Sequence, residues 1–239
     1  MKITPIKTRI FREDENLLEF ILQNVKRIPE SSILVVTSKI VALSEGRVAE
    51  FKNTKEKIRQ KIRLIKKESD FALKTKYVWL TIKDGMVMAN AGVDESNADG
   101  KIILLPKDSF QSADLIRKKL KKIFKLKKLG VLITDSRVFP LRAGTVGVAL
   151  GYAGFKGVRD YRDTPDIFGR ILKMSRTDVA DSLATSAVLS MGEGKEQQPL
   201  ALISDAPALF VDKIDKKELL IDPKEDLYLP IFRSILKKW

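Results

Sequence analysis

Residues 130–135, GVLITD, and residues 144–154, GTVGVALGYAG, are two apolar runs with no helical pattern between them. Each has the β-branched or small apolar residues of a short buried strand. Helical and strand-like segments follow one another along the rest of the chain without a strict β-α-β rhythm. The order of elements therefore predicts an α+β fold.

The segments on either side carry the local patterns of further helices and strands. Asp84-Gly85 lies between two apolar runs and predicts the turn of a hairpin. Ser112 is expected to open a lysine-rich helix. Helices are predicted at 13–25, 52–76, 113–128, 178–191 and 227–239, and strands at 31–43 with a break at 37–39, 77–83, 85–93, 101–106 and 198–204.

The chain of 239 residues contains neither cysteine nor histidine. Without cysteine, disulfides, thiolate zinc sites and cysteine nucleophiles are excluded. Without histidine, the usual general base, a Ser-His-Asp triad and imidazole metal ligands are excluded as well. Any bound metal must be held by oxygen atoms, which favours Mg²⁺ or Mn²⁺ over zinc or copper.

The formal net charge is +14 and the isoelectric point is about 9.8. This charge favours an anionic partner, without choosing among nucleic acid, nucleotide, a membrane surface and a small polyanion. No apolar run approaches the roughly 20 residues that span a bilayer, and the N-terminus lacks the apolar stretch of a signal peptide. A soluble, cytoplasmic protein without a membrane partner is expected.

The stretch 90–100, NAGVDESNADG, is rich in oxygen ligands for a connection between two strands. A hairpin loop would need only about two to five residues. Asp94 lies in this stretch, Asp135 follows a buried strand, and Glu193 stands between two glycines. Each carboxylate alone also fits an ordinary turn or strand end. Together, in a chain without histidine or cysteine, they predict a site that holds divalent cations against phosphates.

Two other motifs have simpler interpretations. Ile116, Leu120, Ile123 and Phe124 share one face of the helix predicted at 113–128, so its lysines form a solvated outer face. Nucleic-acid or membrane binding by these lysines stays open, although no aromatic residues alternate with them. The tetrapeptide GEGK resembles the end of a Walker A motif, but position 189 is Leu where the first glycine should stand.

Several blocks together resemble the coenzyme F420-0 gamma-glutamyl ligases. They are VVTSKIVALSEGR, NAGVDESN, GVLITDS followed by RAGTVGVALG, then DIFGR, DVADSLA and MGEG. Their order and approximate spacing match that family over about residues 3–204. The resemblance implies a single ligase catalytic unit over 1–239, with a subdomain at about 85–150. It also implies the family's mixed-sheet α+β fold and an intertwined homodimer.

The activity implied by the resemblance is a GTP-dependent ligase that joins L-glutamate to a carboxylate of a deazaflavin coenzyme. The acceptor carboxylate would be activated as an acyl phosphate, with release of GDP and phosphate. Mg²⁺ or Mn²⁺, and K⁺ as a monovalent cation, would assist. Phosphoryl transfer depends mainly on positioning and charge neutralisation, so the missing histidine is no obstacle.

By motif match, the implied metal ligands are Asp94, Asp135, Ser136 and Glu193, with Asp94 and Asp135 as the catalytic residues. The implied nucleotide contacts are Ser38, Lys39, Asn97, Gly192 and Gly194, and Arg9 is a candidate phosphate contact. The chain departs from the family pattern at four positions. Ala42 and Leu43 replace a second Ser-Lys pair, and Val138 and Phe139 replace a Gly-Arg pair.

Alternatives remain at the level of the sequence. The same chemistry on a folate acceptor, as in folylpolyglutamate synthesis, fits equally well, and ATP fits as well as GTP. A second alternative is a non-catalytic relative that binds nucleotide or nucleic acid, although the retained carboxylates argue against it and no specific nucleic acid is expected. A third is another carboxylate-activating enzyme with a different amine donor.

Overall fold

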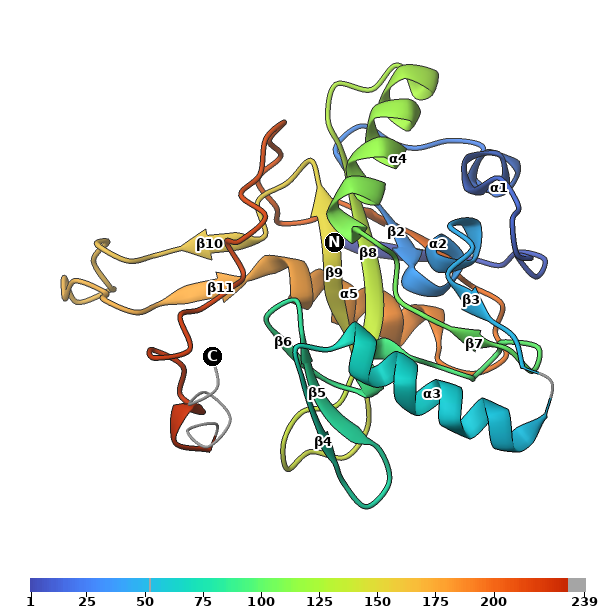
Figure 1. Ribbon diagram of the computed structural model, residues 1–239. Helices are drawn as coiled ribbons and strands as arrows, with labels where there is room; N and C mark the ends of the chain where they lie inside the picture. The colour runs from blue at the N-terminus through green and yellow to red at the C-terminus, as the bar shows by residue number, and fades with distance from the viewer. Residues whose placement is uncertain (52, 232–239) are drawn as a thin grey trace. The chain divides into compact units, whose positions relative to one another are not determined.

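The computed structural model describes residues 1–51 and 53–231, which form two compact units (Figure 1). The first unit consists of Met1–Glu50 and Asp94–Lys216. The second consists of Phe51–Val93 and Lys217–Trp239. Residues 85–150, for which the sequence predicts a subdomain, are thus divided between the two units. Among the described residues no helix has the length and apolar character needed to cross a membrane.

The first unit is built on a five-stranded sheet (Figure 1). β2 pairs with β8 in parallel, whereas the other neighbours are antiparallel, so the sheet is mixed. The α+β class is confirmed at this level. The strand order is β1 (Lys2–Ile6), β12 (Leu200–Ser204), β2 (Ser32–Thr37), β8 (Leu129–Arg137) and β9 (Val146–Ala153).

Helices and short strand pairs surround this sheet. Asn16, Asp108 and Asp178 each accept backbone N–H bonds at a helix start, which satisfies donors that the helix itself leaves unpaired. The helices are α1 (Leu17–Asn24), α2 (Ser38–Ser44), α4 (Ser109–Phe124) and α5 (Val179–Met191). The strand pairs are β3 (Val48–Ala49) with β7 (Ile102–Ile103), and β10 (Val158–Asp160) with β11 (Arg176–Asp178).

Two glycines of β9 bring helices close to the sheet. A Cβ on Gly147 would lie 2.4 Å from the carbonyl oxygen of Ala184 in α5. A Cβ on Gly151 would lie 2.4 Å from the carbonyl carbon of Ser109 in α4. The glycine-rich composition of this strand therefore follows from close packing of both helices on it.

The second unit contains α3 (Thr54–Glu68), the sheet β4 (Phe71–Lys74), β5 (Trp79–Lys83) and β6 (Met86–Ala89), and the short helix η1 (Asn90–Gly92). The predicted hairpin is confirmed, with β5 and β6 antiparallel. Asp84 and Gly85 have φ of 52° and 76°, the positive values that a tight two-residue hairpin turn requires.

Several predicted boundaries are wrong, among them the strand predicted at 85–93, which ends at Ala89 before η1. The apolar run 31–43 does not resume as a strand after its break, because residues 38–44 form α2. The helix predicted at 52–76 ends at Glu68, and its last residues form β4. The lysine-rich helix begins at Ser109 and not at Ser112, because Asp108 caps it. Most of the helix predicted at 227–239 lies outside the described residues.

Candidate functional site

The parallel pair β2 and β8 places the first predicted residues together. Thr37 at the end of β2 lies opposite Thr134 of β8, so the residues that follow each of them emerge at the same edge. Ser38, the first residue of α2, donates its hydroxyl hydrogen bond to Asp135 Oδ1 at 3.3 Å. Carboxyl ends of neighbouring parallel strands are a common location for ligand sites.

Lys39, the next residue of α2, binds the loop that carries Asp94. Its Nζ donates to Asp94 Oδ2 at 2.8 Å and to the Ser96 carbonyl and hydroxyl oxygens at 2.5 and 3.1 Å. The N–H groups of Glu95 and Ser96 donate to Asp94 Oδ1. Partial burial raises the pKa of Asp94, but the hydrogen bonds from Lys39 and Ser96 outweigh it and hold this pKa below its ordinary value. Asp94 is therefore a fixed anion at neutral pH.

The loop after α5 completes the cluster. Ser136 Oγ donates to Glu193 Oε1 at 2.7 Å, and the Asn97 amide donates to the Gly194 carbonyl at 3.3 Å. Gly192 has φ of 85°, and a Cβ there would lie 2.4 Å from Glu196 Cδ, so the position requires glycine.

The structure thus brings most of the predicted residues into one cluster, all within the first unit. We name it the α2–β8 cluster, and its members are Ser38, Lys39, Asp94, Asn97, Asp135, Ser136, Gly192, Glu193 and Gly194. The Arg9 side chain contacts Glu15 and Phe20 instead. Its Nη1 forms an ion pair with Glu15 at 2.8 Å, and its guanidinium lies 5.1 Å from the centre of the Phe20 ring.

The oxygen atoms of the cluster fit a hard divalent cation. Within the described part of the chain, no group of three carboxylates is close enough to hold a metal by itself. Mg²⁺, however, is commonly held by one or two carboxylates together with water and substrate phosphates. Ser136 and Glu193 supply two such oxygens 2.7 Å apart. The Asp135 carboxylate, one residue earlier in β8, is bonded to Ser38 and Arg137. Asp94 is held separately, by Lys39 and Ser96.

Sequence reasoning missed Arg137, the last residue of β8. Its side chain is 8% exposed, and its Nη1 donates to Asp135 Oδ2 and, at 3.1 Å, to the Ser136 carbonyl oxygen. Its Nε and Nη2 are buried without a hydrogen-bond partner among the described residues. No signal in the sequence marked it, because an arginine after a strand resembles an ordinary surface residue.

A second missed pair lies at the start of α5. Asp178 Oδ1 accepts the N–H of Asp181, and Asp181 Oδ1 accepts the N–H of Ala149 in β9 at 2.8 Å. Asp178 reaches solvent, but desolvation by the surrounding protein, together with the neighbouring charge of Asp181, raises its pKa to about 6. Two acids three residues apart at a helix start could have indicated this coupling, since such residues share a face.

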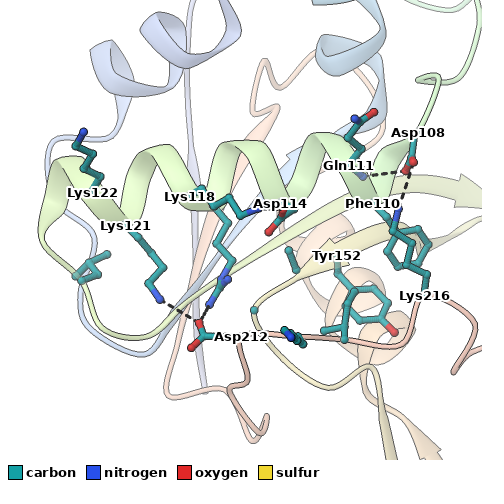
Figure 2. Close-up of a pocket in the computed structure, with 16 residues that line it drawn as sticks. Asp108, Phe110, Gln111, Asp114, Lys118, Lys121, Lys122, Tyr152, Asp212 and Lys216 are labelled. Atoms are coloured by element: carbon teal, nitrogen blue, oxygen red, sulfur yellow. Dashed lines mark hydrogen bonds and ion pairs between the residues drawn. The ribbon is translucent and has the colours of Figure 1, made fainter.

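The lysine-rich face of α4 lines a cavity of about 990 Å³ (Figure 2). Across it, Lys121 pairs with Asp212 at 3.2 Å and Lys216 with Asp108 at 3.3 Å. None of the α2–β8 cluster lines this cavity. Of the four residues predicted to form the helix's apolar face, Ile116 and Leu120 are buried, whereas Ile123 is 48% exposed.

Comparison with known proteins gives one consistent result. Residues 5–205 match the family described as F420-0:gamma-glutamyl ligase. A protein of Methanococcus maripaludis named coenzyme F420:L-glutamate ligase is 36% identical, over 84% of this chain and 86% of its own length. Proteins of the same name from Methanocaldococcus jannaschii and Methanopyrus kandleri are 34% and 32% identical, over 98% and 84% of this chain and 97% and 86% of their own lengths.

Proposed function

The chain belongs to the F420-0:gamma-glutamyl ligase family, and from this premise we propose that it joins L-glutamate to an acceptor carboxylate with a nucleoside triphosphate as the energy source. The observation that carries the proposal is the α2–β8 cluster. Residues distant in the sequence are hydrogen-bonded there, and the group contains one lysine ammonium, three carboxylates and several small residues. Three anionic substrates also suit a chain of net charge +14.

The chemistry has two steps. An oxygen of the acceptor carboxylate attacks the γ-phosphorus, the bond to the β-phosphate oxygen breaks, and the nucleoside diphosphate leaves. The glutamate amine then attacks the acyl carbon, phosphate leaves with the bonding electron pair, and the nitrogen loses a proton to solvent. The family name and the relatives' names favour a coenzyme F420 acceptor, with a folate as the alternative to test. GTP is the proposed nucleotide, with ATP as the alternative.

The chain's own residues position and neutralise the reactants. Lys39 presents an ammonium group beside Asp94, and a phosphate oxygen would replace one of the three acceptors that this group now has. Asn97 and Gly194 hold the adjoining loop, and the absence of a side chain at Gly194 lets a phosphate approach the main chain. Asp135, Ser136 and Glu193 would hold Mg²⁺ or Mn²⁺. When bound, such an ion neutralises charge on phosphate oxygens.

A homodimer is part of the proposal. The arm formed by β10, β11 and the residues between them exposes several large apolar side chains, three of them almost completely. Ile167, Phe168 and Met174 are 91%, 88% and 86% exposed. A second copy of the chain that covers this arm would remove them from water. Sedimentation analysis of wild type and Phe168→Asp tests this, and a monomeric wild type would contradict it.

The deciding experiment for the activity is phosphate release by the purified protein. The reaction contains Mg²⁺ or Mn²⁺, L-glutamate, GTP or ATP, and either a deazaflavin acceptor or a reduced folate. Release that requires glutamate and one acceptor is expected, and Asp135→Asn should abolish it. Asp114→Asn, which breaks an exposed ion pair with Lys118, is the matched control. Nucleotide binding without release in any combination would favour a non-catalytic binding protein.

A further inference from the structure

The first unit contains two buried arginines, and they differ in one respect. Arg117 is 5% exposed and Arg137 is 8% exposed. Arg117 Nε donates to the Leu129 carbonyl oxygen at 2.8 Å, and its Nη2 donates to Asp212 at 2.5 Å. In Arg137 the corresponding Nε and Nη2 have no partner in the described part of the chain. One buried arginine thus has its Nε–Nη2 edge filled by the protein, and the other does not.

The unpaired edge is the one that recognises oxyanions. Nε–H and Nη2–H of a guanidinium point in parallel and match two oxygens of a carboxylate or phosphoryl group. Asp135 and the Ser136 carbonyl oxygen accept hydrogen bonds from Nη1 and make none with Nε or Nη2. Two buried donors without partners are unfavourable, because each loses its hydrogen bonds to water.

We propose that the Nε–Nη2 edge of Arg137 binds an oxyanion of the ligase substrates, a carboxylate or a phosphoryl group, beside the α2–β8 cluster. The position follows from β8 itself, since Asp135, Ser136 and Arg137 are consecutive and the first two belong to the cluster. The identity of the anion as a substrate group rests on the proposed function. The presence of an anion site at Arg137 does not depend on the proposed function, because it is inferred from the buried donors that lack partners among the described residues.

Access requires a local rearrangement, because both nitrogen atoms are buried. The residues that follow β8 directly after Arg137 are exposed. Val138 and Phe139 are 59% and 51% exposed, and Leu141 is fully exposed with φ of 58°. Apolar side chains held in water have little packing to lose when they move.

The test follows the Nε–H signal of Arg137 by nitrogen-15 NMR of the full chain. L-glutamate, inorganic phosphate and GTP are added separately, without metal. A saturable shift of the Arg137 signal with one of them is expected, while the Arg117 signal stays in place. A response to glutamate alone assigns a carboxylate subsite, and a response to phosphate or GTP assigns a phosphoryl subsite.

Variants separate this role from a structural one. Arg137→Lys keeps a charge for Asp135 but cannot offer the paired donors, so affinity for the responding anion should fall about 10- to 100-fold. Arg117→Lys is the matched buried control and should leave that affinity unchanged. If Arg137→Lys does not fold, the wild-type titration decides by itself.

The outcomes distinguish this inference from the proposed function. No shift of the Arg137 signal with any of the three anions overturns the inference, even if wild type is an active ligase. Wild-type affinity in a folded Arg137→Lys overturns it as well. A saturable shift in a protein that releases no phosphate supports the anion site and counts against ligase activity.

Discussion

Replacing Lys39 by Met should reduce turnover far more than stability. The Lys39 side chain is 27% exposed and its partner Asp94 is 46% exposed, so water screens their ion pair. Pairs of this kind contribute about 0.2–1 kcal/mol to the free energy of unfolding. For a unit of this size, such a loss lowers the melting temperature by no more than about 2–4 °C.

Lys39→Met should change the turnover rate much more than it changes the melting temperature. Lys39 is the lysine that the α2–β8 cluster holds in place, through three hydrogen bonds to Asp94 and Ser96. Removing one preorganised group that stabilises charge in a transition state lowers turnover by about 10²–10³-fold. Phosphate release at saturating nucleotide, glutamate and acceptor, measured beside a melting curve, checks both expectations.

Lys101 offers a matched control. It is 33% exposed and bonds to Glu13 at 2.5 Å and Glu50 at 2.6 Å, outside the cluster. Lys101→Met should lower the melting temperature by at least as much as Lys39→Met and leave turnover unchanged. If Lys39→Met retains wild-type turnover, or if both variants lose activity in proportion to their loss of stability, the assignment of Lys39 to the reaction is refuted.

Two further predictions concern α5. The raised pKa of Asp178, about 6 against an ordinary 3.8, means that its proton stabilises the fold below about pH 4 and that this contribution is lost as the pH rises through 6. Asp178→Asn keeps an oxygen that accepts the Asp181 N–H and removes the negative charge. The variant should therefore melt at a higher temperature than wild type near pH 8 and at about the same temperature near pH 4. A difference in melting temperature that does not depend on pH would contradict this. Gly147→Ala places a Cβ 2.4 Å from the Ala184 carbonyl oxygen and 2.5 Å from Val188 Cγ2, and it should lower the free energy of unfolding by about 1–3 kcal/mol in urea titration, whereas unchanged stability would show that the helix moves away freely.

Much of the sheet could be predicted from the sequence, because the signals are local. β8, β9 and β12 are short apolar runs, and α4 and α5 have apolar residues at helical spacing. α2 could not be predicted, since a short apolar run with β-branched residues fits a buried strand and a buried helix equally well. Its Ile40, Val41 and Ala42 are all buried, so no polar face marked the helix.

The sequence motifs predicted which residues belong to the candidate site, but not which of these residues contact one another. Asp94 and Asp135 were identified from their positions after apolar runs and from family blocks. The pairing of Lys39 with Asp94 joins residues 55 positions apart, and only the folded chain shows it. Arg137 carried no signal because its interest lies in burial and in unpaired donors, which composition and spacing do not encode.

The departures at Ala42 and Leu43 explain why Lys39 should be so sensitive to substitution. These positions match a second Ser-Lys pair in the family, which could supply another amine. Here Ala42 is fully buried and packs with Ala98 and Ile103, and Leu43 packs against the same cluster. Ala98 belongs to the segment that carries Asp94, so apolar contacts fasten this segment to α2 where the family pattern would place a charge. With that amine replaced by packing, the charge that α2 brings to the site comes from Lys39.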